Sequence, residues 1–408
     1  MKQTVYIYAQ RPEDLEFQTL GRLTVENGVG QWIYSPNYKG TWVPDEVHYP
    51  LRKEEYIVRS NNGIPGFVMD LMPDNWGKSL IKRLLGSELD RELTDIDYLR
   101  LSQNADRFGN LTIGEIRNPP KKATTENFQR FNKISNFIEL VDKVRLGEPI
   151  DRIGLALFQT SSLGGARPKI TLRDDNNLFL AKPKDMDDLV DTPTVEYLCL
   201  RFAASKGFQV CDFLHEQINY LGIPRNLLIL TRFDRTYNEE FQVFERHPML
   251  SALSLLDATW ISDDTRRWSY PLLANEMLRK NIPTKDIQEL YKRMAFNALI
   301  GNDDDHPKNH AFIYKNDQWR LAPLFDVVPN TEFYPTRLAM KIGEQGELIN
   351  RSNLLSMHTH FRLSLEEAIA ILDEVASWED EIRAIYSQEL TPSDYSLVER
   401  ALDSKRLL

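Results

Sequence analysis

The chain has 408 residues, of which 42% are hydrophobic and 27% charged, so it is long enough for two or three compact units of ordinary globular composition. Its 50 basic and 60 acidic residues give a net charge of -10, which argues against a broad charge-driven binder of nucleic acids or membrane surfaces but leaves room for a local basic patch. Two cysteines are too few for a disulfide-rich secreted scaffold. With no run of 18 apolar residues and no signal-peptide pattern at the start, we expect a cytoplasmic protein that does not enter a membrane.

Residues 1–118 are predicted to form a small β-rich domain. Short apolar runs bounded by turn residues predict antiparallel strands at 5–8, 21–25 and 30–34. Trp76 follows a turn of Pro, Asp and Asn and is expected to anchor that corner in a core, and a helical segment is expected at 79–85. The polar stretch 118–127 contains two prolines and two lysines, which predicts a linker and the first domain boundary.

Residues 119–240 form the second predicted domain, which contains a helix at 136–145 and then a hairpin. The hairpin consists of strand-like runs on either side of a turn of two Asp and two Asn residues, at 170–173 and 178–182. The period of two places Lys182 on one face with Leu178 and Leu180. An ammonium group there needs a negative partner, either a nucleotide phosphate or a carboxylate, unless it extends into solvent.

A loop of small residues at 160–169 precedes this hairpin, with Ser161, Ser162, Gly164, Gly165 and Ala166 at its centre. Small residues let backbone N–H groups approach an anion closely, so the loop can cradle a phosphate. A plain turn between two strands is the other interpretation. The Gly-Lys-Ser/Thr of a Walker loop is absent from this stretch of sequence.

A helix is expected next, with Thr192 as its N-cap, Pro193 in its first position and Gly207 at its end. Its early acid, Glu196, can pair with Lys182 or serve the helix dipole as a first-turn acid. A buried strand at 227–230 then leads into Thr231, Arg232, Phe233, Asp234 and Arg235. A strand that ends in this way can offer its backbone N–H and C=O groups for hydrogen bonds to the edge of an adenine ring.

Residues 241–408 form the third predicted domain, which is mainly helical. Helical spacing of apolar residues and capping residues, among them Ser364 and Ser393, predict five helices: 249–258, 269–280, 286–300, 364–382 and 393–403. A hairpin is predicted between the third and fourth of these helices, with strands at 311–314 and 319–322.

The loop at 301–310 carries three consecutive acids, Asp303, Asp304 and Asp305, directly after the helix that Gly301 ends. Asp and Asn compete for backbone hydrogen bonds and Pro lacks an N–H, so this segment does not continue the helix. Carboxylates with the side-chain amide of Asn309 suit a divalent cation and a proton acceptor. A solvated turn is the alternative reading of such an acidic run.

The order of these parts is that of eukaryotic-like protein kinases. In the catalytic loop of such kinases the base Asp precedes the metal-binding Asn by five residues, and here only Asp304 stands five residues before Asn309. A hairpin then leads to a second metal-binding acid, which corresponds to Asp326. We therefore expect Mg²⁺ on Asn309 and Asp326, ATP phosphates on Lys182, and Asp304 orienting a hydroxyl.

The chain closely resembles the HipA family of bacterial toxin kinases. Four motifs in the same order carry the resemblance: 72–78, 162–169, 232–235 and 301–309. Two departures from the general kinase pattern also belong to this resemblance. His306 follows the base by two residues instead of preceding it, and Asp326 is followed by Val327 and Val328 instead of Phe-Gly. The resemblance spans nearly the whole chain. It implies an α+β, bilobal protein-kinase-like fold with a small N-terminal β-rich subdomain and a helical C-terminal lobe.

This resemblance implies a serine/threonine kinase that is the toxin of a type II toxin-antitoxin pair. Such kinases arrest growth by phosphorylating a translation component, typically an aminoacyl-tRNA synthetase. A small helix-turn-helix antitoxin, HipB-like, neutralises them, so contact with DNA is expected only through that partner. The family also implies autophosphorylation of Ser162, with Ser161 adjacent, which adds about two negative charges where ATP phosphates should sit and so shuts the kinase off.

The resemblance also implies binding residues, with Asp234 and His306 on the ribose. The full set implied for ATP is Lys182, Ser162, Gly164, Gly165, Ala166, Arg232, Phe233, Asp234, His306 and Lys308. Two positions depart from the family pattern. Thr231 stands where Glu is usual, and Asp305 stands where Gly or Arg is common. The extra carboxylate can change metal affinity or raise the pKa of Asp304.

Three other functions remain open from the residues alone. A metal-dependent hydrolase would use Asp303, Asp304, His306 and His310, although Pro307 opposes a helical presentation of the two histidines. An inactive kinase-like corepressor is the second, but the catalytic groups that it would lack are present. A kinase of a small molecule, such as a sugar or an aminoglycoside, is the third.

Overall fold

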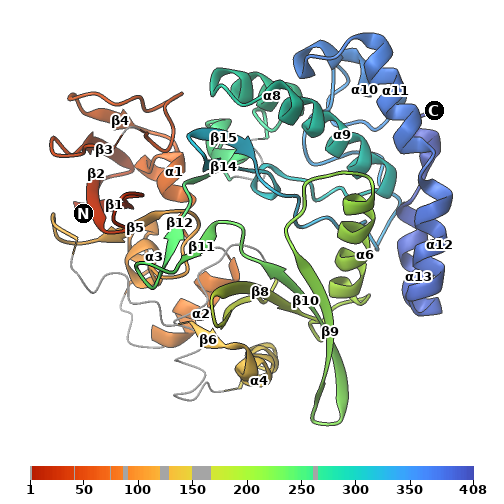
Figure 1. Cartoon of the computed structure of the whole chain (residues 1–408), viewed down its shortest axis with the longest axis horizontal. Coiled ribbons are helices and arrows are strands. Elements are labelled where there is room, and N and C mark those ends of the chain that lie inside the picture. The colour runs from red at the N-terminus through yellow and green to blue at the C-terminus, as the bar shows by residue number, and fades with distance from the viewer. Residues whose placement is uncertain are drawn as a thin grey trace. The chain divides into compact units, whose positions relative to one another are not determined.

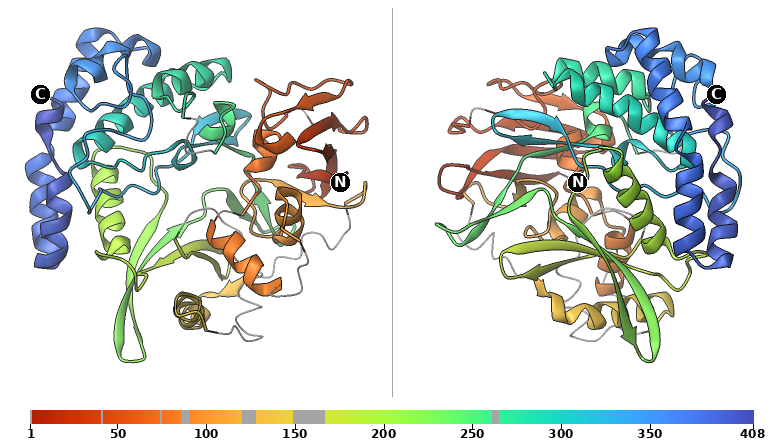
Figure 2. Two further views of the ribbon diagram at one scale, coloured as in Figure 1. Left: turned by 180° about the vertical axis from the view of Figure 1, so that it is seen from behind. Right: turned by 45° about the vertical axis from the view of Figure 1, so that its right-hand side comes forward.

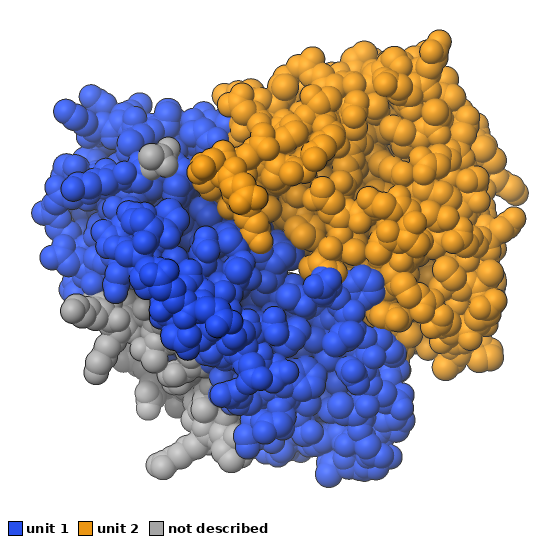
Figure 3. Space-filling model, in the orientation of Figure 1, with its two compact units in different colours: residues 1–187, 212–249 blue, residues 188–211, 250–408 orange. Residues whose placement is uncertain are grey.

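The computed structural model describes residues 2–40, 42–73, 75–85, 91–119, 128–148, 167–260 and 265–408. The chain divides into two compact units, which Figure 3 distinguishes by colour. Unit 1 comprises Met1–Asp187 and Asp212–Met249, and unit 2 comprises Asp188–Cys211 and Leu250–Leu408. The three domains expected from the sequence divide the chain in another way, and that division stays a prediction.

The N-terminal part of unit 1 is an antiparallel sheet in the order β4-β3-β2-β1-β5 (Figure 1). Its strands are β1 (Gln3–Gln10), β2 (Phe17–Glu26), β3 (Val29–Tyr34), β4 (Tyr56–Val58) and β5 (Leu111–Gly114). The helices α1 (Gly66–Met69), α2 (Asn75–Leu85) and α3 (Asp95–Leu101) lie between β4 and β5 in the chain. Trp32 is fully buried and packs edge-on against Phe67 at 5.3 Å. The three strands predicted here are therefore confirmed.

A second sheet of unit 1 has the order β6-β7-β8-β10-β9. Its strands are β6 (Gln129–Arg130), β7 (Ile170–Asp174), β8 (Asn177–Pro183), β9 (Phe213–Tyr220) and β10 (Ile223–Thr231). Helix α4 (Ile134–Arg145) buries its apolar side in the same core as Trp76, which confirms the anchoring role predicted for Trp76. The β9–β10 hairpin extends beyond the rest of its sheet (Figures 1 and 2). The small hairpin of β11 (Arg235–Asn238) and β12 (Val243–Arg246) follows.

Unit 2 is mainly helical. Its helices are α6 (Thr192–Ser205), α7 (Ala252–Leu255), α8 (Tyr270–Arg279), α9 (Thr284–Ile300), α10 (Arg351–Ser356), α11 (Leu365–Ala376), α12 (Glu379–Glu389) and α13 (Pro392–Val398). A three-stranded sheet in the order β13-β14-β15 accompanies them, with strands β13 (Met249–Ser251), β14 (Ala311–Lys315) and β15 (Gln318–Leu321). Short 3-10 turns complete the described chain at Asn61–Gly63, Phe131–Lys133, Pro307–Asn309, His358–Phe361, Glu399–Ala401 and Ser404–Arg406.

Several predicted helix ends were wrong for identifiable reasons. The N-cap of α6 is Asp191, whose carboxylate accepts the Thr194 N–H at 3.3 Å, so Thr192 is already helical. The predicted helix at 249–258 is a strand followed by one helical turn, because Ser251 caps a new start. The helix expected at 364–382 is two helices, α11 and α12. The cap of α13 is Thr391, which leaves Ser393 inside the helix.

No helix in the described part of the chain is both long and apolar enough to cross a membrane.

Candidate active site

The acidic loop begins where helix α9 ends. Nearly every residue of the second half of α9 is buried, and Gly301 closes the helix in the left-handed conformation with φ +68°. A Cβ atom at this position would lie 2.5 Å from the Ala401 carbonyl oxygen. Both the backbone conformation and the close approach therefore require glycine here. The helix end fixes the point at which the loop leaves the core of unit 2.

Asp304 presents its carboxylate to solvent, with 84% of its side chain exposed. Its backbone carbonyl oxygen accepts a hydrogen bond from Asn309 Nδ2 at 2.8 Å, and Asn309 N–H donates to the His306 carbonyl oxygen at 2.9 Å. The five-residue step thus closes a small loop that joins the two residues. Because the amide NH₂ is donated, Oδ1 of Asn309 remains the acceptor atom of that side chain.

The two neighbouring acids point elsewhere. Both oxygens of Asp303 accept from Asn330 Nδ2, at 3.0 Å each. Asp305 is fully buried, and it accepts from the Tyr270 hydroxyl at 2.6 Å and from the Ala339 N–H at 2.7 Å. Burial raises the pKa of Asp303, and burial raises the pKa of Asp305 to about 7. One acid of the three is therefore exposed, and two are held by donors.

His306 lies against an aromatic pair in unit 2. Its ring meets the Trp260 ring edge-on at 4.6 Å between centroids, and Trp260 stacks on Trp268 at 5.3 Å. Burial lowers the pKa of His306, while the carboxylates of Asp304 and Asp326 act to raise it. The Lys308 ammonium lies 4.2 Å from the centre of the same Trp260 ring. His306 Nε2 is 3.8 Å from Asp304 Oδ1, which is too long for a hydrogen bond.

His310 faces the protein interior. It is 2% exposed, and its Nε2 lies 3.2 Å from the Tyr270 hydroxyl. Burial lowers its pKa to about 3, so the imidazole is neutral at physiological pH. The four side chains of the hydrolase hypothesis, Asp303, Asp304, His306 and His310, thus do not converge. Within the described residues, no group of three or more His, Cys, Asp or Glu side chains is arranged to hold a metal ion.

Asp326 follows the β14–β15 hairpin in a strained conformation with φ +53°. Its backbone N–H donates to Oε1 of Glu196 at 3.0 Å, and Glu196 is 3% exposed on α6. Since α6 begins at Thr192, Glu196 is its fifth residue and not the first-turn acid considered above. A non-glycine residue in the left-handed region is kept only where surrounding contacts hold it, and such residues gather at functional sites.

Asn309 and Asp326 have the chemistry that Mg²⁺ requires. An amide oxygen and a carboxylate are hard oxygen donors, which this cation prefers, and it is commonly bound through one or two carboxylates plus substrate phosphates. The acceptor oxygen of Asn309 and the half-buried Asp326 therefore fit the predicted role. The binding of Mg²⁺ by these two residues stays a prediction.

Lys182 lies in unit 1, on strand β8 opposite Leu228 of β10. It is 7% exposed, so its ammonium group is held within the protein and does not extend freely into solvent. The predicted hairpin is confirmed by the register Arg173↔Leu178 and Ile170↔Ala181. A pairing of Lys182 with Glu196 would join the two units and stays a prediction.

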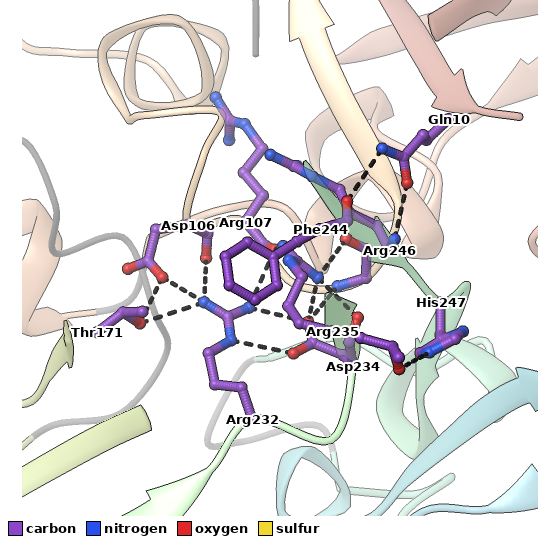
Figure 4. Close-up of polar contacts among 12 residues, drawn as sticks. Gln10, Asp106, Arg107, Thr171, Arg232, Asp234, Arg235, Phe244, Arg246 and His247 are labelled. Atoms are coloured by element: carbon purple, nitrogen blue, oxygen red, sulfur yellow. Dashed lines mark hydrogen bonds and ion pairs between the residues drawn. The ribbon is translucent and has the colours of Figure 1, made fainter. Parts of the chain in front are cut away.

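The segment after β10, which was expected to bind ATP, forms a buried ionic network in unit 1 (Figure 4). The Asp234 carboxylate accepts from Arg232 Nε at 3.0 Å and Nη2 at 2.8 Å, from Arg235 Nη1 at 2.6 Å and from the Gly109 N–H at 3.1 Å. Arg232 also donates to Asp106. Although burial alone would raise it, the two arginines hold the pKa of Asp234 well below its usual value.

These contacts give Arg232 and Asp234 a structural role, and their predicted contacts with ATP and its ribose stay predictions. Asp234 is 5% and Arg232 6% exposed, and the four hydrogen bonds of Asp234 all come from the protein itself. The network ties the turn at 106–109 to β7, through Thr171, and to β11. Phe233, which lies between Arg232 and Asp234 in the sequence, is half-buried.

Comparison with known proteins identifies the family of the chain. A family model for the HipA-like C-terminal domain matches residues 161–382, which is more than half of the chain. The chain belongs to this family. The resemblance inferred from the four motifs is thereby confirmed.

Two curated relatives of this HipA-like chain are named as kinases. "Putative kinase Y4mE" of Sinorhizobium fredii is 28% identical over 158 residues, which covers 37% of this chain and 36% of that protein. A "Putative kinase" of Haemophilus influenzae is 23% identical over 274 residues, which covers 58% of this chain and 78% of that protein. The chain thus matches only about a third of the length of the first relative.

A solved structure has the same fold. The Shewanella oneidensis toxin-antitoxin complex of HipA, HipB and operator DNA matches with a TM-score of 0.67 at 17% identity, over 99% of this chain and 96% of that chain. The likeness bears out the predicted α+β, kinase-like fold with a β-rich N-terminal part and a helical C-terminal part.

Five predicted residues of the HipA-like glycine loop lie outside the described residues. They are Ser161, Ser162, Gly164, Gly165 and Ala166. Their roles in phosphate binding and autophosphorylation stay predictions.

The sequence alone did not identify the residues that support the acidic loop. Tyr270, Asn330 and Trp260 stand 34, 26 and 44 residues from Asp304, counted along the sequence. Asn330 follows a proline and was readable as a turn residue. No spacing rule links the three to the loop, because their contacts arise from tertiary packing.

Proposed function

We propose that this HipA-like protein is an ATP-dependent kinase that transfers the γ-phosphoryl group to a serine or threonine hydroxyl of a protein. The observation that carries the proposal is the Asp304–Asn309 loop, in which a residue with an exposed carboxylate is held at its backbone carbonyl by a side-chain amide whose oxygen remains an acceptor. Membership of a family with relatives named as kinases supports the same conclusion. Phosphoryl transfer depends chiefly on positioning and on neutralising charge, and these groups are suited to both tasks.

In the proposed mechanism Asp304 orients the acceptor hydroxyl and takes up its proton. Asn309 holds the backbone carbonyl oxygen of Asp304 in place, while the carboxylate of Asp304 is exposed to a substrate. No covalent enzyme intermediate is required. Such a general base typically contributes about 10²–10⁴-fold to the rate.

Three sets of residues would hold ATP and Mg²⁺. Asn309 and Asp326 would hold Mg²⁺, which neutralises charge on the transferring group when bound. Lys182 would meet the phosphates of ATP, with the glycine loop at 160–169 covering them. His306 and Lys308, packed on Trp260, would contribute to nucleotide binding.

The biological role that we propose is that of a toxin in a toxin-antitoxin pair. The target would be a translation component, and an aminoacyl-tRNA synthetase is the first candidate. A HipB-like helix-turn-helix antitoxin would neutralise the kinase and bring it to DNA; the Shewanella complex of HipA, HipB and operator DNA supports such a partner. Autophosphorylation of Ser162, or of Ser161, would switch the kinase off by placing negative charge in the phosphate site.

The rival functions differ in their support. The separation of His310 from Asp304 disfavours a metal-dependent hydrolase. The geometry does not distinguish the proposed protein kinase from a kinase of a small molecule or a kinase-like corepressor, and the following experiment does.

The deciding experiment compares cells that express the wild-type chain with cells that express Asp304→Ala, by phosphoproteomics. The proposal expects a phosphorylated translation protein, and phosphate on Ser162, only with the wild type. Growth arrest that a co-expressed HipB-like protein relieves would support the toxin role. A wild-type protein that neither binds ATP nor changes the phosphoproteome would refute the kinase.

A further inference from the structure

Three consecutive acids stand in the catalytic loop, but only the middle one is exposed. We infer that Asp303 and Asp305 are positioning residues, which hold the peptide unit of Asp304 from both sides so that its carboxylate faces the substrate. The inference rests on the proposed kinase function and concerns residues to which that function gave no role. It explains why this loop carries acids on both sides of its base.

The first brace is Asp305. Its carboxylate is fully buried and accepts two hydrogen bonds, from the Tyr270 hydroxyl at 2.6 Å and from the Ala339 N–H at 2.7 Å. Tyr270 is the first residue of α8 and is itself fully buried. Asp305 is thereby tied to a helix and to the bend at residue 339. Short hydrogen bonds to a carboxylate are among the stronger polar contacts in proteins.

Tyr270 is in turn fixed by helix α9. Its hydroxyl accepts from Asn297 Nδ2 at 3.0 Å and lies 3.2 Å from His310 Nε2. Asn297 also accepts, through Oδ1, from Asn302 Nδ2 at 3.1 Å. The chain of contacts therefore starts in α9, passes through Tyr270, and reaches both ends of the acidic loop. Its members are 0–2% exposed, so an unmade bond within it would be costly.

The second brace is Asp303. Its two oxygens share the amide of Asn330 at 3.0 Å, and the Asn330 N–H donates to the Gly301 carbonyl oxygen at 2.9 Å. Asn330 Oδ1 accepts from the Glu332 and Phe333 N–H groups, which fixes the turn that bears it. This brace joins the loop to the segment that begins at Asp326. The loop that carries the base and the segment that carries a metal ligand are thus one hydrogen-bonded assembly.

The consequence for catalysis is geometric. The side chains of Asp303 and Asp305 are turned inward, and the Asp304 carbonyl oxygen is bound by Asn309. The loop is therefore anchored at three consecutive residues. Misplacing a reacting group by about 1 Å can cost about 10²-fold in rate. Loss of either brace is therefore expected to lower kcat while leaving the nucleotide affinity in place, because neither acid lies among the groups proposed to touch ATP.

The test uses the full chain with Asp303→Asn, Asp305→Asn and Tyr270→Phe, and Asp317→Asn as the control, since Asp317 is an exposed acid in the turn of the neighbouring hairpin. Hydrogen exchange of peptides covering 302–310 is measured first. Faster exchange in the three variants, but not in Asp317→Asn, is expected whether or not the protein transfers phosphate. Unchanged exchange in all three would overturn the bracing.

Phosphoryl transfer is measured next, on variants whose melting temperatures show them to be folded. We expect kcat for Asp305→Asn to fall about 10–100-fold with KM for ATP nearly unchanged. The double variant Asp305→Asn with Tyr270→Phe should lose less than the sum of the two single losses, because the two residues share a hydrogen bond. A folded Asp305→Asn with wild-type kcat would overturn the inference. An inactive wild type would instead refute the proposed function, while the exchange data would still decide the bracing.

Discussion

The acidic loop of unit 2 and the 232–235 segment of unit 1 look alike in sequence, because each is a short run of charged residues after a buried element. In the structure they differ in exposure. Asp304 has 84% of its side chain exposed, whereas the Asp234 side chain is 7% exposed and accepts four hydrogen bonds from the protein. Charged residues are available for chemistry where the fold leaves them exposed. The first segment is therefore the candidate for chemistry, and the second stabilises unit 1.

The largest effect on stability is expected from Arg232→Met. This change leaves the buried carboxylates of Asp106 and Asp234 without their shared guanidinium group. Breaking a buried ion pair from one side typically costs about 3–5 kcal/mol, to be measured by urea unfolding. The control is Arg201→Met, since Arg201 forms a half-exposed pair with Glu389 that is worth about 0–1 kcal/mol. Equal losses in the two variants would show that the network is not the stabilising element proposed here.

Asp305 should make stability depend on pH. Burial raises its pKa from 3.8 to about 7, so between about pH 4 and pH 7 the folded protein keeps a proton that the unfolded chain has released. The contribution of Asp305 to the free energy of unfolding is fully present below about pH 4. It declines by about 2–4 kcal/mol as the pH rises to about 7. Asp305→Asn should flatten the dependence in unfolding curves taken across this range. A variant with the wild-type slope would assign the dependence to other groups.

Asp326 offers a test of backbone strain at the site. Asp326→Gly and Asp326→Ala remove the same carboxylate, but only glycine adopts φ +53° without cost. We expect the glycine variant to be about 1 kcal/mol more stable than the alanine variant. At ordinary positions the order is reversed, so a more stable alanine variant in thermal unfolding would contradict the strain.

The smallest change in stability is expected for Asp304→Ala. Its carboxylate is mostly exposed and is not hydrogen-bonded to His306. Surface substitutions of this kind usually stay within about 0.5 kcal/mol. A larger loss in chemical denaturation would mean that Asp304 supports the fold, which would weaken the contrast between the two segments.

The sequence predicted well whatever depends on local pattern. The hairpins at β7–β8 and β14–β15, the end of α9 at Gly301 and the cap at Ser364 follow from turn residues, helical spacing and capping chemistry. The family followed from four motifs in order. The five-residue step from Asp304 to Asn309 corresponds to a real hydrogen bond in the loop.

Tertiary packing decided what the sequence did not reveal. Nothing local distinguishes Asp305, which Tyr270 and Ala339 bind, from Asp304, which faces solvent. The same limit explains the network around Asp234, which accepts from the Gly109 N–H and reaches Asp106 through Arg232, more than 100 residues away in the sequence. The displaced helix starts have a local cause, because two nearby side chains can each cap the same helix. The observed caps, Asp191 and Thr391, lie one or two positions before the predicted ones.

The most direct test of the account is the transfer of label from γ-labelled ATP to protein by the wild type and by Asp304→Asn, which keeps the shape of the side chain and removes its basicity. Melting temperatures within a few degrees of each other would establish that both are folded. We predict Mg²⁺-dependent transfer by the wild type and a loss on the order of 10³-fold in the variant. Equal transfer by the two proteins would contradict the assignment of Asp304 as the base.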